Sequence, residues 1–420
     1  MSDKAVLTVN GRTYAIPETC AVAICIDGCE PDYFDQAIAA GKMPNLARIK
    51  QSGTVRLAHS VVPSFTNPNN LSIATGQPPS VHGICGNFLY DPESGEEVMM
   101  NDPKFLRAPT LFKSFYETGK KVAIVTAKDK LRALLGHGLQ FDENRAICFS
   151  AEKSAATSLA EHGIDKASDW LGMPVPDVYS AQLSEFVFAA GVKLLREYKP
   201  DILYLTTTDY VQHKHAPGTP LANEFYAMFD HYLGELDALG AAIIMTGDHG
   251  MKAKHKADGS PNVIYLQDLL DDWLGAGKAR VILPITDPYV VHHGALGGYA
   301  TAYLPDETDI KTIVERLNGL GGIVLALDNH DACERFQLPP DRVGDIVIIS
   351  AADVVLGTSA DRHDLAALDV PLRSHGGLSE QTVPFIINRK LDDIPDAPTL
   401  RNFDAYYYVS RAAAQEGSQP

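Results

Sequence analysis

Three short motifs combine histidine with aspartate or glycine at spacings that could hold a metal ion. They are Asp209-x-x-x-His213, Asp248-His249-Gly250 and Ser374-His375-Gly376-Gly377. A borderline-soft cation such as zinc accepts a mixture of imidazole and carboxylate ligands, whereas magnesium prefers oxygen ligands alone. Taken one at a time, each motif is equally typical of a turn or of a polar surface. Together with Asp27, the motifs predict a site for divalent metal.

A candidate nucleophile, Thr66, lies in the segment 63–76 (PSFTNPNNLSIATG). Pro68 suits the first turn of a helix and Gly76 suits its end, so we expect a helix to begin beside Thr66. Free N–H groups at a helix start favour a phosphate-like group. A threonine hydroxyl becomes a competent nucleophile when a divalent metal lowers its pKa. The alternative is that Thr66 only caps the helix.

Short apolar runs alternate with helical stretches along the chain. The runs are 21–26, 121–125, 202–205, 241–245 and 383–387, and the clearest helical stretches are 183–198 and 224–239. Runs that are apolar at every position are typical of strands buried on both faces, as in a parallel sheet. The alternation predicts a doubly wound α/β fold, with a mostly parallel sheet flanked by helices.

Three candidate ligands follow these runs within a few residues. Asp27 follows the first run, and Asp209 and Asp248 follow two of the later ones. Open α/β sheets bind their ligands at the carboxyl ends of the strands. We therefore expect the candidates to converge at one edge of the sheet.

A long stretch separates His249 from His375. Within it, 280–285, 299–304, 322–327 and 344–349 are expected to form further strands. We therefore predict a catalytic core formed by 1–254 and 367–420, and a smaller inserted α+β cap domain at 255–366 that lies over the site.

The segment after Thr66 resembles the nucleotide pyrophosphatases/phosphodiesterases of the alkaline phosphatase superfamily. The matching residues are 75–84 (TGQPPSVHGI) and 87–92 (NFLYDP). The resemblance implies an alkaline-phosphatase-like core in which Thr66 is the nucleophile. It implies two zinc ions, with manganese or iron as substitutes, held by Asp27, Thr66, Asp248 and His249 and by Asp209, His213 and His375. It also implies that Asn87 donates a hydrogen bond to a phosphoryl oxygen, although Asn87 is equally typical of a turn.

Lys128 and Lys130 follow the run 121–125. Lysines two positions apart in an extended segment point the same way, although such lysines are often only solvated surface charges. Chain length and the paired lysines are similar to the phosphonoacetate hydrolase family. This resemblance implies cleavage of the carbon–phosphorus bond of phosphonoacetate, through a phospho-threonine on Thr66, with both lysines binding the substrate carboxylate. His292 and His293 are further candidates for substrate contact.

Other functions remain open. A nucleotide pyrophosphatase/phosphodiesterase or a phosphomonoesterase of the same superfamily would use the same metal ligands. A phosphoryl transferase of the cofactor-independent phosphoglycerate mutase kind would share them too, although such mutases use serine and are longer. A metal-binding module without turnover is the alternative from a different class.

Composition and charge limit the kinds of molecule that the protein can bind and where it can be located. The chain has 420 residues, is 45% hydrophobic and carries a net charge of -17, so we expect no nucleic-acid partner. The small anionic phosphonate is the partner that the resemblance implies. We expect no membrane span and no secretory signal, because no apolar run is long enough. The six scattered cysteines favour reduced thiols in a cytoplasmic protein. A homodimer is expected from base rates alone, and the tail after Ser410 is expected to fray.

Overall fold

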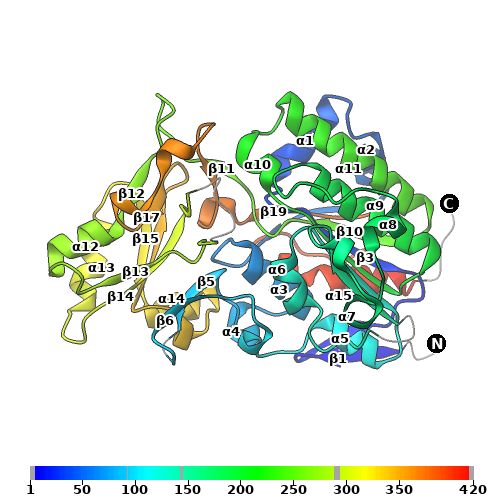
Figure 1. The fold of residues 1–420 in the computed structure, drawn as a ribbon, viewed down its shortest axis with the longest axis horizontal. Helices are drawn as coiled ribbons and strands as arrows, with labels where there is room; N and C mark the ends of the chain where they lie inside the picture. The colour runs from blue at the N-terminus through cyan, green and yellow to red at the C-terminus, as the bar shows by residue number, and fades with distance from the viewer. Residues whose placement is uncertain (1–4, 92, 142–144, 288–293, 416–420) are drawn as a thin grey trace.

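The structure is a computed structural model that describes residues 5–91, 93–141, 145–287 and 294–415 (Figure 1). In these residues, seven strands form the central sheet, in the order β4-β19-β10-β3-β9-β7-β8. Their bounds are Thr54–His59 (β4), Thr382–Ile387 (β19), Ala242–Thr246 (β10), Ala21–Cys25 (β3), Ile202–Thr206 (β9), Val122–Thr126 (β7) and Ala146–Ser150 (β8). All five apolar runs are strands of this sheet.

The pairs from β10 through β8 are parallel, which confirms the mostly parallel sheet. Strand β19 differs, since it runs antiparallel to both of its neighbours, β10 and β4. Its apolar run resembles those of the parallel strands because it is likewise almost fully buried. Burial on both faces therefore predicts a central strand but not its direction.

Helices cover both faces of the sheet. Along β3, Ala21, Ala23 and Cys25 pack into one hydrophobic cluster, and Val22 and Ile24 pack into the other. The first face is covered by α3 (Thr66–Thr75), α5 (Leu111–Glu117), α6 (Asp129–Leu135) and α15 (Ala405–Ala413). The second is covered by α1 (Pro31–Ala39), α2 (Pro44–Ser52), α9 (Gln182–Glu197) and α11 (Pro220–Ala238). Each fully buried valine, leucine or isoleucine contributes roughly 1.5–3 kcal/mol, which explains why these strands are apolar throughout.

A smaller lobe lies beside the main one, in yellow-green to orange in Figure 1. Its described residues hold an antiparallel four-stranded sheet, β13-β14-β16-β15, and three longer helices. The bounds are Arg280–Ile282 (β13), Tyr299–Tyr303 (β14), Ile346–Ser350 (β16), Ile323–Asp328 (β15), Leu266–Leu274 (α12), Ile310–Asn318 (α13) and Asn329–Phe336 (α14). The four strands expected between His249 and His375 are present, and the domain boundaries at 255 and 366 stay a prediction.

Shorter elements complete the described chain. The strand pairs are β1 (Val6–Val9) with β2 (Arg12–Ala15), β5 (Phe88–Asp91) with β6 (Glu96–Met99), β11 (Lys252–Ala253) with β18 (Arg373–Ser374), and β12 (Val263–Tyr265) with β17 (Val355–Gly357). The short helices are α4 (Pro79–His82), α7 (Leu159–His162), α8 (Ala167–Leu171) and α10 (Tyr210–Lys214).

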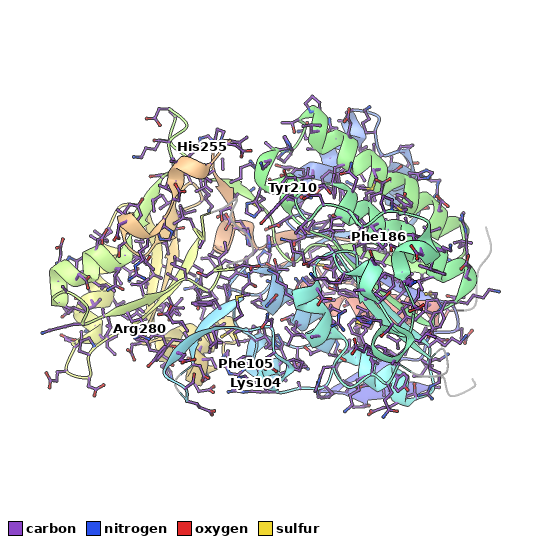
Figure 2. All side chains as sticks on the ribbon, viewed as in Figure 1. Lys104, Phe105, Phe186, Tyr210, His255 and Arg280 are labelled. Atoms are coloured by element: carbon purple, nitrogen blue, oxygen red, sulfur yellow. The ribbon has the colours of Figure 1, made fainter. Side chains whose placement is uncertain are left out.

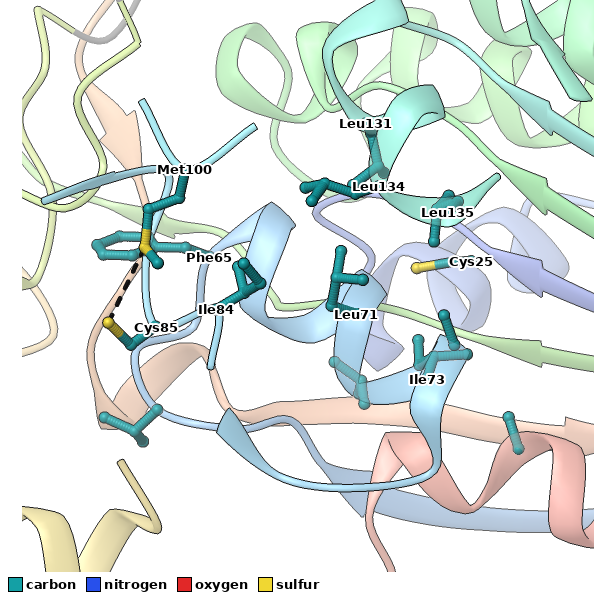
Figure 3. Packing of buried hydrophobic residues seen from close by; sticks show 14 of the residues in the cluster. Cys25, Phe65, Leu71, Ile73, Ile84, Cys85, Met100, Leu131, Leu134 and Leu135 are labelled. Atoms are coloured by element: carbon teal, nitrogen blue, oxygen red, sulfur yellow. Dashed lines mark hydrogen bonds between the residues drawn. The ribbon is translucent and has the colours of Figure 1, made fainter. Parts of the chain in front are cut away.

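One hydrophobic cluster runs from the main sheet into the smaller lobe. Figure 3 shows part of it, where Phe65 and Met100 lie near Ile84, and Leu71 of α3 lies near Leu134 of α6. Phe65 also meets Tyr299 of β14 edge-on, with 6.1 Å between ring centroids. Side chains fill both lobes, from Arg280 on β13 to Phe186 on α9 (Figure 2). The two lobes therefore share packing next to Thr66.

Three expectations about the chain as a whole can be compared with the structure. The prediction that the tail frays after Ser410 is wrong as far as residue 414. Helix α15 continues to Ala413, and Ala412 to Ala414 are buried. The six cysteines, all of them in described residues, are free. None of the described helices is both long and apolar enough to cross a membrane.

Candidate active site

A pocket opens at the carboxyl ends of β3, β7 and β9. Its chemically capable lining residues come from several elements: Asp27, Thr66, Asn87, Lys128, Lys130, Asp209, Asp287 and His375. Asp287 and its neighbour Ile285 follow β13 of the smaller lobe. The pocket therefore lies at the sheet edge where the ligand motifs are expected to converge, and it is closed from the other side by the smaller lobe.

Six side chains form one buried group, which we call the ligand cluster: Asp27, Asp209, His213, Asp248, His249 and His375. The rings of His249 and His375 stack with 3.6 Å between centroids. Asp209 Oδ2 lies 2.9 Å from His213 Nε2 and 3.6 Å from His375 Nε2. Asp27 Oδ1 lies 3.2 Å from His249 Nε2. Positions far apart in the sequence are thus in direct proximity.

Each histidine of the cluster is oriented by a backbone carbonyl. The Nδ1 atoms of His213, His249 and His375 lie 2.7, 2.8 and 2.7 Å from the carbonyl oxygens of Arg373, Gly250 and Ser64. A carbonyl oxygen only accepts, so each Nδ1 carries a proton and Nε2 is the ring nitrogen left to bind a metal ion. These Nε2 atoms face the carboxylates. Outer hydrogen bonds of this kind fix metal-binding histidines in proteins.

The electrostatics of the cluster also fit a cation. Burial and the neighbouring Asp27 raise the pKa of Asp248 well above its usual range. Burial acts to raise the pKa of Asp209, but His213, His375 and Lys128 together outweigh it and hold that pKa well below its usual range. Asp27 Oδ1 and His249 Nε2 are buried and hydrogen-bond to no described residue. A divalent ion would satisfy both atoms.

Two trios within the cluster have the proximity that a metal ion requires. They are Asp27, Asp248 and His249, and Asp209, His249 and His375, with ligand atoms within 4.8 Å of one another. The first trio falls inside one predicted ligand set. The second brings His249 together with two residues of the other set, so the division into two ions stays a prediction.

Thr66 is the first residue of α3, and it lines the pocket. The N-cap is Phe65, so the alternative that Thr66 caps the helix is wrong. Pro68 lies in the first turn and Gly76 ends the helix at a φ of 66°, both as expected. The Thr66 N–H at the α3 start is thus adjacent to the threonine hydroxyl, whereas the Asn67 N–H donates to Asn87 and Pro68 has no N–H.

The amide of Asn87 is held in one orientation. Its Oδ1 accepts a hydrogen bond of 3.1 Å from the backbone N–H of Asn67, the second residue of α3. Its own backbone N–H donates to Pro284 of the smaller lobe at 2.8 Å. With Oδ1 engaged, Nδ2 is the donor that the amide offers to the pocket, as its predicted role requires.

The lysine segment differs from the expectation. Lys128 precedes α6 and Lys130 lies in its first turn, so the segment is not extended. Both lysines still line the pocket, but they reach it from a helix start. Lys130 forms an ion pair with the buried Asp287. Lys128 is half-buried, and partial burial followed by repulsion from Lys130 lowers its pKa.

Sequence reasoning missed some residues of the site. Asp287 lies in no motif, and its pairing with Lys130 spans 157 positions, so no local signal marks it. Thr207, whose Oγ1 accepts from the Asp27 N–H at 3.0 Å, had a signal, because it follows a strand directly. His292 and His293 lie outside the described residues.

The chain is similar to known phosphoryl hydrolases. Two solved structures of phosphonoacetate hydrolase from Sinorhizobium meliloti 1021, in complex with phosphonoacetate and with phosphonoformate, are 70% identical to it. Each has a TM-score of 0.96 and aligns over 98% of this chain and 100% of that one. A murine ectonucleotide pyrophosphatase/phosphodiesterase 5 shares the fold, at 18% identity, a TM-score of 0.64 and 96% coverage of both chains.

A pyrophosphatase/phosphodiesterase of Schizosaccharomyces pombe, described as uncharacterized, is 25% identical over 60% of this chain and 44% of its own length. The chain matches less than half the length of its curated relatives. A family model described as type I phosphodiesterase / nucleotide pyrophosphatase matches residues 21–377, which is most of the sequence. The protein therefore belongs to the type I phosphodiesterase / nucleotide pyrophosphatase family, in the alkaline phosphatase superfamily.

Proposed function

We propose that this protein is a phosphonoacetate hydrolase, which cleaves the carbon–phosphorus bond of phosphonoacetate to give acetate and phosphate. One observation carries the proposal: a single pocket is lined by Thr66, by three residues of the ligand cluster and by two lysines. A phosphonate and a carboxylate separated by one carbon need those two kinds of group at the two ends of a small site. The 70% identity to a phosphonoacetate hydrolase supports the same conclusion.

The ligand cluster would hold two zinc ions. Asp27, Thr66, Asp248 and His249 would bind one, and Asp209, His213 and His375 would bind the other. When bound, the ions lower the pKa of the Thr66 hydroxyl and stabilise negative charge on the attacking and leaving sides. Manganese and iron suit the same mixture of ligands. A homodimer and a cytoplasmic location stay predictions.

The residues of the chain then have distinct roles. Thr66 Oγ attacks phosphorus and forms a phospho-threonine as the carbon–phosphorus bond breaks. The Thr66 N–H at the start of α3 and the Asn87 amide donate hydrogen bonds to the phosphoryl oxygens. Attack of water on phosphorus then releases phosphate and restores Thr66.

The lysines account for the difficult part of the reaction. Carbon is a poor leaving group, but the carboxylate beside it takes up the developing negative charge. Lys128 and Lys130 would bind that carboxylate, so their attraction strengthens as the charge forms. The leaving carbon takes a proton and becomes the methyl group of acetate.

A nucleotide pyrophosphatase/phosphodiesterase is the second candidate, because the family model describes such enzymes, and a phosphomonoesterase would use the same metal ligands. A panel with zinc-loaded protein separates the two, with phosphonoacetate, a chromogenic phosphodiester and a chromogenic phosphomonoester assayed side by side. We expect the highest kcat/KM for phosphonoacetate, with acetate and phosphate released in equal amounts. Much faster turnover of either ester would overturn the proposal in favour of the second candidate.

A further inference from the structure

Asn70 lies in α3 four residues after Thr66, and its side chain is fully buried. Its Nδ2 donates to the carbonyl oxygen of Thr66 at 3.0 Å and to Asp248 Oδ2 at 3.3 Å. Its Oδ1 accepts from Tyr204 Oη at 2.7 Å and from Thr206 Oγ1 at 2.9 Å. Two donors and two lone pairs are thereby all used.

This arrangement permits one orientation of the amide. Turning it over would place Oδ1 against the Thr66 carbonyl and the Asp248 carboxylate, which are both acceptors. Tyr204 and Thr206 lie on β9 and hold the amide from behind. Asn70 is therefore a fixed donor that faces the nucleophile residue and a candidate metal ligand together.

Asp248 is fixed from two sides. Its Oδ1 accepts from the N–H groups of Gly28 at 3.2 Å and His249 at 2.9 Å. Its Oδ2 accepts from Asn70, and this oxygen lies 3.8 Å from His249 Nε2. A donor on Oδ2 occupies one lone pair and leaves the other to the cluster. Asn70 thus directs the oxygen of Asp248 that lies nearer the His249 ligand nitrogen.

We propose that Asn70 is a positioning residue that sets Asp248 and Thr66 in a fixed relation to one ion. The inference rests on the proposed function, in which both residues bind that ion. Catalytic groups need placement within roughly 0.5 Å of the productive geometry. One amide that bonds to both residues couples the start of the nucleophile helix to the strand end that carries Asp248.

Asn70→Leu tests this proposal, because leucine has a similar volume and makes no hydrogen bond. Zinc is titrated against a competing chelator, and kcat and KM for phosphonoacetate are measured at saturating zinc. We expect one of two ions to bind about 10–100-fold more weakly, as when outer partners of metal ligands are lost. We expect kcat to fall and KM to change little, because Asn87 and both lysines are untouched.

Tyr204→Phe is the matched control. It removes one donor to Asn70 Oδ1 and leaves both bonds from Nδ2, so zinc affinity and kcat should stay near those of the unaltered protein. The melting temperature of each metal-free variant measures its loss of packing. A loss of zinc affinity and kcat in Asn70→Leu alone then reports the loss of positioning. Should Asn70→Leu fail to fold, Asn70→Ala keeps the helix and removes the same hydrogen bonds.

Unchanged zinc affinity and kcat in the Asn70 variant would overturn the inference, as would equal losses in both variants. An unaltered protein that binds no zinc would overturn it too. If the unaltered protein binds two ions but does not cleave phosphonoacetate, the proposed function fails. The zinc titration still decides whether Asn70 positions Asp248.

Discussion

Single side chains decide which atoms of the site face inward. The histidines of the ligand cluster each donate from Nδ1 to a carbonyl, and this leaves Nε2 to bind. The sequence shows the residue types and their spacing, so it predicted which side chains gather at the sheet edge, and their binding of metal stays a prediction. It could not show the carbonyls of Ser64 or Arg373, because these lie 311 and 160 positions from the histidines that they orient.

Replacing Thr66 tests the nucleophile. Thr66→Ala should abolish turnover of phosphonoacetate, because the hydroxyl that attacks phosphorus is lost. Most zinc binding should remain, because the six residues of the ligand cluster are intact. Thr66→Ser is the matched control and should keep part of the activity. Turnover at the original rate in Thr66→Ala would show that another group attacks phosphorus.

Replacing Lys128 tests recognition of the carboxylate. A hydrogen bond to a charged group contributes roughly 1.5–3 kcal/mol, so Lys128→Ala should lower kcat/KM for phosphonoacetate about 10–100-fold. A phosphate ester without a carboxylate should lose much less. Lys153→Ala, at an exposed position, is the control and should change neither substrate. Equal losses on both substrates would mean that Lys128 does not bind the carboxylate.

The buried His82 should make the free energy of unfolding depend on pH. The Ile84 N–H donates to its Nδ1 at 3.2 Å, and its Nε2 lies 2.9 Å from Ser72 Oγ, so the ring is neutral. Burial, then Arg342, lowers its pKa from 6.5 to about 3. Between these values the unfolded chain binds a proton that the folded chain does not. Stability should therefore fall as pH falls from 6.5 toward 3.

Unfolding of the metal-free protein by urea at a series of pH values measures this loss. It should be on the order of a few kcal/mol, since each pKa unit corresponds to about 1.4 kcal/mol. His82→Gln cannot be protonated in this range, so its stability should depend less steeply on pH. The same slope in both proteins would refute the role of His82.

Helix starts and tight turns place these side chains. The start of α3 could be predicted, because Pro68 and Gly76 mark a helix that begins beside Thr66. The start of α6 was missed, because Lys128 directly follows a strand and its segment was taken as a continuation of it. The lysines were thus predicted to share a site for a reason that proved wrong.

The turn after His375 makes a further prediction. Gly376 has a φ of 119°, and an added Cβ would lie 2.4 Å from Phe65 Cε1. Gly376→Ala should therefore push against Phe65 and displace His375, with a loss of at least about 1 kcal/mol and weaker zinc binding. Gly321→Ala, where an added Cβ meets nothing within 4 Å, is the control. Unchanged melting temperature and zinc affinity in Gly376→Ala would contradict this account.

Both lobes of the molecule contribute to the pocket. The α/β core followed from buried runs and from the motifs at their ends. The antiparallel direction of β19 could not be predicted, because the composition of a buried strand is the same whichever way the strand runs. Contacts between the lobes, such as Lys130 with Asp287, join distant positions that only the folded chain brings together.

Metal removal should affect the stability of the whole protein. A ligand that binds only the folded state stabilises it, and a concentration 100 times Kd contributes about 2.7 kcal/mol. Treatment with a chelator should therefore lower the melting temperature and abolish activity, and added zinc should restore both. Magnesium should restore less, because it prefers oxygen ligands. An unchanged melting temperature after verified metal removal would argue against a structural contribution of the ions.

The most direct test of the account is anomalous diffraction at the zinc edge from crystals of the zinc-loaded protein. We predict two peaks beside Thr66, one among Asp27, Asp248 and His249 and the other among Asp209, His213 and His375. A single peak, or ions bound away from Thr66, would contradict the central claim that two ions activate this threonine.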